Sequence, residues 1–174
     1  EDAIRRLTWL VRVHRPDVMT RFTTKIIADK ERCPVILSNG NLRGTANLDN
    51  GKHLALWEDP FPKPSYLFAL VAGDLGSITD TFTTMSGKKV DLAIYCDRGN
   101  EEKCHHAMRS LKKSMEWDEV TYGREYDLEV YNIVAVDSFN MGAMENKGLN
   151  IFNSHYVLAD EDSATDTDFL GIES

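Results

Sequence analysis

Asp137-Ser-Phe-Asn-Met-Gly-Ala-Met-Glu-Asn-Lys-Gly-Leu-Asn-Ile-Phe-Asn153 is the most informative stretch of this sequence. It joins two runs that favour an extended backbone, residues 128–136 and 146–157, because both are rich in β-branched and aromatic side chains. Two small residues and a carboxylate lie at its centre. The pattern predicts two strands that frame a short segment with an open backbone.

The centre of this stretch, Gly142 to Asn146, permits a functional and a structural interpretation. Gly142 and Ala143 leave room for close approach, so a peptide could hydrogen-bond to their backbone as an added strand. Glu145 would then offer a carboxylate that holds a cation through charge-assisted hydrogen bonds. In the structural interpretation the small residues form a bulge and Glu145 points into water, which the spacing alone favours.

The first 75 residues predict a wholly β structure. Residues 21–30 and 34–37 carry strand-forming side chains, and a turn follows at 38–41, so we expect strands joined by a hairpin. Residues 53–57 alternate polar and apolar side chains. The prolines at 60, 62 and 64 are then expected to stop strand pairing.

The later residues add a hairpin, a helix and a loop. Residues 78–85 and 90–95 are strand candidates on either side of a Ser-Gly pair, which is a hairpin signal. Asn100 can cap a helix whose apolar side chains repeat at three- and four-residue spacing up to Gly123. Acidic and small residues from 159 to 168 predict a solvated loop.

These elements divide the chain into two parts near Asp74. Residues 1–74 are expected to form a β-only part and residues 75–174 a mixed β-α-β part, and neither part has the pattern of a complete domain. The expected fold class is therefore mixed β and α+β.

Composition excludes several classes of partner. The 28 acidic residues outweigh 20 basic ones, and a net charge of -8 repels the phosphates of nucleic acid. No apolar run approaches the roughly 20 residues of a membrane span. Three scattered cysteines, Cys33, Cys96 and Cys104, suit a reducing compartment, so we expect a cytoplasmic protein.

The five residues from Gly142 to Asn146 resemble the exopeptidase motif of the aminopeptidase N (alanyl aminopeptidase) family of gluzincin zinc metallopeptidases. Further segments are similar to the bacterial-type branch of that family, so the resemblance spans nearly the whole chain. They are Arg15-Pro-Asp-Val18, Arg21-Phe-Thr-Thr24, Leu37-Ser-Asn-Gly40, Asp59-Pro-Phe-Pro-Lys-Pro64 and Tyr66-Leu-Phe-Ala-Leu-Val-Ala-Gly-Asp74. The resemblance implies the end of a β-rich amino-terminal domain over residues 1–74, followed by a truncated thermolysin-like catalytic domain over residues 75–174.

The resemblance also implies an activity, the removal of one residue from peptides with a free amino terminus. Glu145 would bind the substrate α-amine, the backbone of Gly142 and Ala143 would align the peptide, and Met141 would line the pocket for the first side chain. The implied substrate-binding residues are Met141, Gly142, Ala143, Met144, Glu145 and Asn146. Because such a carboxylate requires an ammonium group beside the scissile bond, peptide bonds in the interior of a chain are excluded as substrates.

The family holds zinc with a His-Glu-x-x-His helix and a further glutamate, and this sequence has no such motif. We therefore expect the zinc ligands and the catalytic residues beyond Ser174, in the remainder of a parent polypeptide. No catalytic residue, no metal ligand and no hydrolysis are expected of this chain alone. The family also has an amine-binding glutamate ahead of the Arg-Pro segment, and neither Glu1 nor Asp2 is assigned that role.

A second hypothesis is a non-catalytic β-rich module that binds peptides or proteins. In that case Gly142 to Asn146 serve only the structure. A His-Glu-x-x-His motif directly after Ser174 would decide for the enzyme, and unrelated sequence would decide for the binding module.

Overall fold

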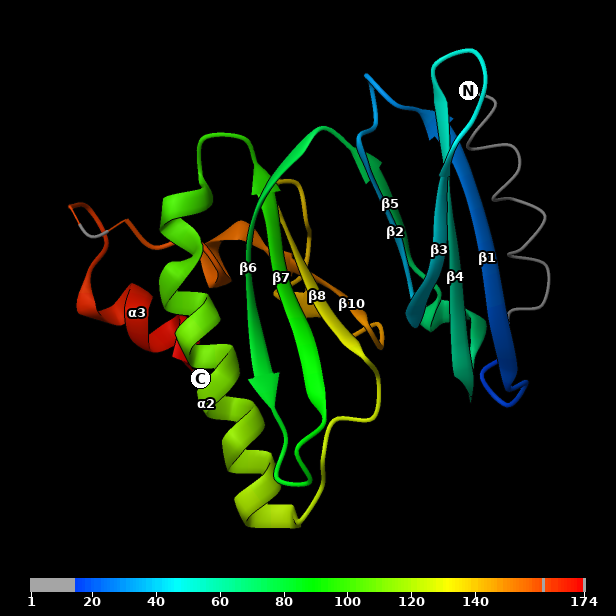
Figure 1. Cartoon of the computed structure of the whole chain (residues 1–174). Helices are drawn as coiled ribbons and strands as arrows, with labels where there is room; N and C mark the ends of the chain where they lie inside the picture. The colour runs from blue at the N-terminus through cyan, green and yellow to red at the C-terminus, as the bar shows by residue number, and fades with distance from the viewer. Residues whose placement is uncertain (1–14, 161, 174) are drawn as a thin grey trace.

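The computed structural model describes residues 15–160 and 162–173, and Glu1 and Asp2 lie outside that range. A five-stranded sheet forms the centre of the fold (Figure 1). The helix α2 (His105–Tyr122) covers one face of this sheet, and two smaller sheets lie on the other side (Figure 1). No helix in this part of the chain is both long and apolar enough to cross a membrane.

The two smaller sheets come from the first part of the chain. One has the strand order β1-β4-β3, the other pairs β2 with β5, and all of their pairs are antiparallel. The strands are β1 Thr20–Asp29, β2 Val35–Ser38, β3 Asn41–Asn47, β4 Lys52–Lys63 and β5 Leu70–Gly73. A 3-10 turn, η1 Ser65–Leu67, leads from β4 to β5.

The expected hairpin around residues 38–41 is wrong in its pairing. The turn does join β2 to β3, yet these strands belong to different sheets. Gly40 permits the crossing, because its φ is +87° and a Cβ there would collide with the backbone of Glu58. The chain therefore passes from one sheet to the other at this turn.

The prolines after Glu58 do not stop strand pairing as expected. β4 continues to Lys63, with Phe22 opposite Asp59 and Thr20 opposite Lys63, and the register shifts between these pairs. β3 pairs with β4 only as far as Glu58, so beyond it β4 has one side without a strand partner among the described residues. Prolines are tolerated in such edge segments.

The central sheet has the order β6-β7-β8-β10-β9. β6 and β7 form the antiparallel hairpin expected around the Ser-Gly pair, whose Gly87 has a φ of +88°. β7, β8 and β10 run parallel, and β9 returns antiparallel to β10 at the edge. The strands are β6 Leu75–Thr83, β7 Lys89–Asp97, β8 Val130–Val136, β9 Ala143–Met144 and β10 Leu149–Asn153.

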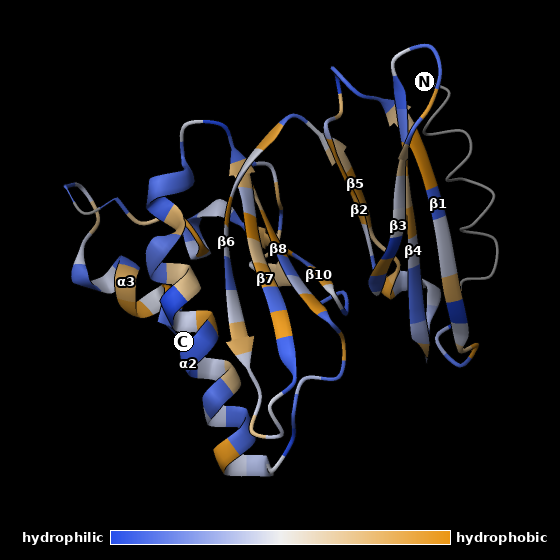
Figure 2. Cartoon of the chain, in the orientation of Figure 1, coloured by the Kyte–Doolittle hydropathy of each residue, from blue (hydrophilic) through white to orange (hydrophobic). Residues whose placement is uncertain are grey.

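The expected helix after Asn100 is confirmed. A 3-10 turn, η2 Glu101–Cys104, leads into α2, and α2 ends at Gly123 in the left-handed conformation with a φ of +61°. The side chain of Asn100 makes no capping hydrogen bond. Hydrophilic and apolar residues alternate along α2 (Figure 2), as a helix that covers one face of a sheet requires.

The solvated loop expected over residues 159–168 is wrong for its last three residues, 166–168, which are helical. After η3 (Ser154–Tyr156), a short helix α3 covers Asp166–Glu173 and lies beside α2 (Figure 1). The side chain of Asp168 accepts hydrogen bonds from the backbone nitrogen and hydroxyl of Thr165, and the Thr165 hydroxyl accepts one from the Asp168 nitrogen. This reciprocal capping turns an acidic segment into a helix start.

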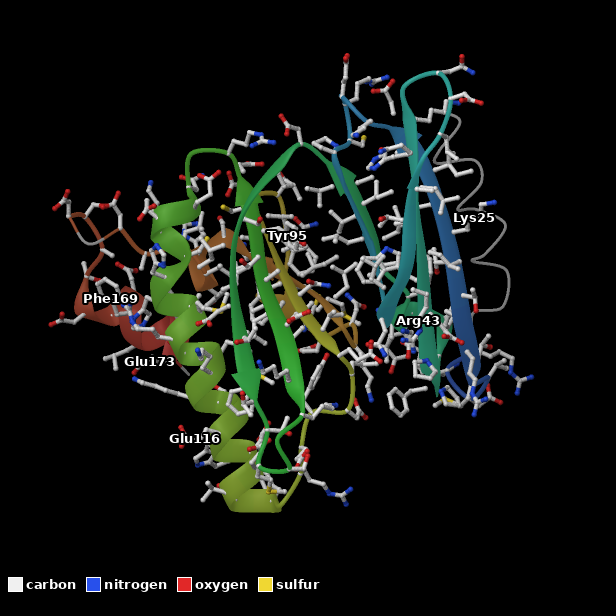
Figure 3. The ribbon with its side chains drawn as sticks, in the orientation of Figure 1. Lys25, Arg43, Tyr95, Glu116, Phe169 and Glu173 are labelled. Atoms are coloured by element: carbon white, nitrogen blue, oxygen red, sulfur yellow. The ribbon has the colours of Figure 1, made fainter. Side chains whose placement is uncertain are left out.

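Two buried clusters of side chains hold these layers together. One lies between the central sheet and α2. The other joins Trp57 and Leu37 of the smaller sheets to Val134 and Leu149 of the central sheet. Tyr95 lies between the central sheet and the smaller sheets (Figure 3). The two parts of the chain therefore share a core, which fixes the first part against the strands that carry the candidate site.

Candidate functional site

The motif segment forms an edge strand. In β9, Met144 lies opposite Ile151 and Ala143 lies opposite Phe152, and β9 ends the strand order of the central sheet. The carbonyl of Gly142 points toward β10, where it accepts a hydrogen bond from the amide of Asn153. Because backbone groups alternate between the two sides of a strand, those of Ala143 point to the open edge, which has no strand partner among the described residues. This edge has the geometry to pair with an added peptide strand.

Asn146 closes a turn directly after β9. Its backbone nitrogen and its side-chain Nδ2 both donate to the carbonyl of Met144, at 3.0 and 3.2 Å. Its own carbonyl accepts from the amide of Leu149 at 2.8 Å. Asn146 is only 3% exposed, so its side chain serves the turn that follows the strand.

Glu145 presents an exposed carboxylate between β9 and this turn. None of the described residues makes a hydrogen bond or an ion pair with that carboxylate. Its charge acts on Tyr131 of β8, whose pKa is raised by burial and, to a smaller extent, by Asp118 and Glu145. Glu145 is therefore an available anion on an ordered backbone.

Met141 and Gly142 lie on the surface ahead of β9, and Met141 is 68% exposed. A Cβ on Gly142 would meet Cε2 of Tyr156 at 3.4 Å, so the ring of Tyr156 packs against the bare backbone of this glycine. Tyr156 was not among the residues expected from the sequence. It lies in the extended run of residues 146–157, and nothing in the sequence distinguishes it from the other aromatic residues of that run.

The turn after β9 contacts the first part of the chain. Nδ2 of Asn39 donates to the carbonyl of Lys147 at 3.1 Å. Nζ of Lys147 lies 2.6 Å from a carboxylate oxygen of Asp127 and 3.7 Å from the centre of the Phe61 ring. Contacts with residues that are distant in the sequence therefore fix the position of this turn.

The six expected site residues lie on one continuous segment, although they are not equally accessible. Met141, Gly142 and Glu145 are exposed, Ala143 and Met144 are half-buried, and Asn146 is buried. Glu145 is the only carboxylate among them. The segment thus combines a strand edge with a single negative charge, which suits a ligand that has both a peptide backbone and an ammonium group.

No group of three or more His, Cys, Asp and Glu side chains in the described ranges could hold a metal ion. Cys96 and Cys104 are fully buried thiols. His105 contacts Glu102, whereas His106 contacts the carbonyl of Phe169, so the two rings have different partners.

Two models of one family match this chain. The peptidase M1 N-terminal domain matches residues 10–67, and the peptidase family M1 domain matches residues 106–173. Among curated proteins, the chain is 61% identical over 172 residues to aminopeptidase N of Escherichia coli (strain K12). It is 57% identical over 173 residues to aminopeptidase N of Haemophilus influenzae (strain ATCC 51907 / DSM 11121 / KW20 / Rd). Each match covers 99% of this chain and 20% of the relative.

A solved structure shows the same arrangement of elements. It is the crystal structure of Legionella pneumophila aminopeptidase A in complex with aspartic acid, with a TM-score of 0.87 and 39% sequence identity. The match covers 92% of this chain and 19% of that chain, so the present sequence spans about a fifth of the relatives that it matches. The family matches in both halves and the identities across nearly the whole chain show that it belongs to the M1 peptidases, with a segment of the M1 N-terminal domain followed by the start of the peptidase domain.

Proposed function

We propose that this chain is the substrate-amine-binding part of a zinc-dependent aminopeptidase, which removes the amino-terminal residue from peptides. The exposed carboxylate of Glu145 at the end of an edge strand carries the proposal. The family matches and the aminopeptidase names of the relatives support it. The partners in this proposal are peptides with a free amino terminus and the rest of the parent polypeptide.

A peptide would pair with the open edge of β9 through the backbone of Ala143. Its free ammonium would then lie against Glu145, which has no competing partner among the described residues. Gly142 and Met141 would lie beside the first residue, and Met144 and Asn146 would hold the segment in shape. A substrate that lacks the ammonium would leave the carboxylate without its charge partner. Binding of the interior of a peptide chain at this site is therefore disfavoured.

Zinc belongs to the parent enzyme in this proposal. The described residues do not fit a zinc site, because no group of suitable side chains converges. No metal ligand and no catalytic step is therefore assigned to this chain, which contributes binding and orientation. We also propose that the N-terminal domain ends near Asp74 and that the protein is cytoplasmic, in keeping with its three free cysteines.

The decisive experiment replaces Glu145 with Gln in the aminopeptidase that contains this chain. Alanine p-nitroanilide and its N-acetylated counterpart are compared as substrates. The loss of one charge-assisted contact in a partly dry site costs roughly 2 to 4 kcal/mol, so kcat/KM for the free amine should fall by about 30- to 1000-fold. The acetylated substrate should be little affected.

Glu116 supplies the matched control, since it is an exposed glutamate on the outer side of α2 (Figure 3). Glu116→Gln should leave both substrates unchanged. An unaltered preference for the free amine in Glu145→Gln would remove Glu145 from the amine site. Hydrolysis of alanine p-nitroanilide by the purified 174-residue chain with added zinc would contradict the assignment of the metal to other residues.

A further inference from the structure

The side chain of Asn39, at the turn between β2 and β3, satisfies three backbone groups at once. Its Nδ2 donates to the carbonyls of Leu67 and Lys147, both at 3.1 Å, and its Oδ1 accepts from the amide of Ala69 at 2.7 Å. Asn39 is 2% exposed, so these bonds are shielded from water. Lys147 is 108 positions away in the sequence, and the other two partners belong to the first part of the chain.

The backbones of the two turns are also in direct contact. Gly40 follows Asn39, Gly148 follows Lys147, and both glycines have positive φ angles, +87° and +82°. A Cβ on Gly148 would lie 2.9 Å from the amide nitrogen of Gly40. The turn after β9 therefore fits against the turn after β2 without space for a side chain at this contact.

This contact lies two residues from the candidate amine-binding carboxylate. Lys147 follows Asn146, and Asn146 is bonded through its backbone and side chain to Met144 on the other side of Glu145. The short path from Lys147 to Glu145 is thus ordered at both ends. Because both ends of this segment are held, a displacement of the Lys147 carbonyl should also displace Glu145.

We propose that Asn39 is a positioning residue for Glu145, so that the first part of the chain sets the place where a substrate ammonium is held. The inference rests on the proposed function and adds a residue to it. Amine binding through a charge-assisted hydrogen bond depends steeply on geometry, and displacements of about 1 Å in supporting residues can cost a hundredfold in rate. Asn39 touches no substrate and acts through the turn after β9.

The test compares Asn39→Ser with Ser38→Ala in the aminopeptidase that contains this chain. The serine in Asn39→Ser is too short to reach Lys147. Ser38 is a matched control, because it is 0% exposed and its hydroxyl donates to the carbonyl of Ala69 at 2.9 Å, which stays within the first part of the chain. In Asn39→Ser, kcat/KM for alanine p-nitroanilide should fall about tenfold relative to the acetylated substrate. Ser38→Ala should lose thermal stability and keep that ratio.

A second arm combines Asn39→Ser with Glu145→Gln. If Asn39 acts through Glu145, its replacement should have no further effect on the substrate ratio once the carboxylate is gone. An equal loss in both backgrounds, or a ratio unchanged from Ser38→Ala, would overturn the positioning role and leave the role of Glu145 intact. An unchanged ratio in Glu145→Gln alone would instead overturn the proposed function.

Folding of the variant is checked by its melting temperature before kinetics. If Asn39→Ser yields no folded protein, Asn39→Asp replaces it under the same criteria. Asp has nearly the same volume and keeps the acceptor for the Ala69 amide, yet as a carboxylate it cannot donate to Lys147.

Discussion

The amide of Asn153 donates a 2.9 Å hydrogen bond to the carbonyl of Gly142, and its side-chain Nδ2 donates to the carbonyl of Phe139 at 3.0 Å. One residue at the end of β10 thus holds two points of the segment that leads into β9. The open edge of β9 depends on this support, because a two-residue strand has little pairing of its own.

Replacement of Asn153 with Ala should loosen the segment ahead of β9. The variant loses the bond to Phe139 and the bond that Oδ1 accepts from the amide of His155, and the expected loss of stability is roughly 1 to 2 kcal/mol. Hydrogen exchange should accelerate over residues 138–142. His155→Ala retains the backbone amide that bonds to Asn153 and should leave that exchange unchanged. Equal exchange in both variants would show that the Asn153 side chain does not order the segment.

Gly148 should tolerate no side chain. Its φ of +82° and the 2.9 Å approach of a Cβ to the Gly40 nitrogen predict a loss of about 2 kcal/mol or more for Gly148→Ala in urea unfolding. Gly44→Ala is the control, since a Cβ there meets nothing within 4 Å and its φ is not positive. That variant should change stability by less than about 0.5 kcal/mol or raise it slightly. Similar losses at both glycines would contradict the contact between the two turns.

The buried thiol of Cys104 should make stability fall at high pH. Burial raises its pKa above the ordinary thiol value, with smaller contributions from Cys96 and Glu101. The unfolded chain therefore releases this proton first, and stability present below pH about 8.5 is lost as the pH rises. Between pH 9 and 11 the free energy of unfolding should fall less steeply with pH in Cys104→Ala than in the native chain, by up to about 1.4 kcal/mol per pH unit.

Val90→Ala is the control for this pH dependence. Val90 is also fully buried, and its truncation should lower stability by a similar amount at every pH because no titrating group is lost. A Cys104→Ala curve parallel to that of the native chain would show that the thiol does not contribute.

Local sequence patterns predicted the elements that depend on neighbouring residues. The helix up to Gly123 and the hairpin around Gly87 were predicted because side-chain periodicity and a glycine at a positive φ are local signals. The candidate site was placed in this segment by the resemblance of Gly142 to Asn146 to the exopeptidase motif, because residue spacing alone favoured a structural role. Its pairing as the edge strand β9 had no local signal.

Contacts between distant residues could not be predicted in this way. The bond from Asn39 to Lys147 joins residues 108 positions apart, and nothing in the residues near Asn39 distinguishes it from other turn asparagines. The continuation of β4 through its prolines depends on the absence of a β3 partner beyond Glu58. The loop expectation was wrong for residues 166–168 because acidic composition, typical of a loop, also suits the first turn of a helix.

Asp59 and Lys63 form an ion pair in which both side chains are almost fully buried. Burial lowers the pKa of Lys63, and the hydrogen bond to Asp59 opposes that shift. Removal of the carboxylate in Asp59→Asn should leave a buried charge without compensation and cost about 3 to 5 kcal/mol at pH 7. Replacing both residues with apolar ones, Asp59→Leu with Lys63→Met, should recover most of the loss, because no buried charge remains.

The pH dependence of Asp59→Asn separates this explanation from simple loss of packing. Without Asp59, the pKa of Lys63 in the folded chain falls further below its unfolded value of about 10.4, so the unfolded chain binds the extra proton between these two values. The stability of Asp59→Asn relative to the native chain should therefore rise with pH. Its deficit in the free energy of unfolding, measured in urea, should be smaller at pH 9.5 than at pH 7. A deficit that stays constant over this range would mean that the Lys63 charge is not the cause, since the asparagine oxygen can still accept the bond from the amide of Phe61.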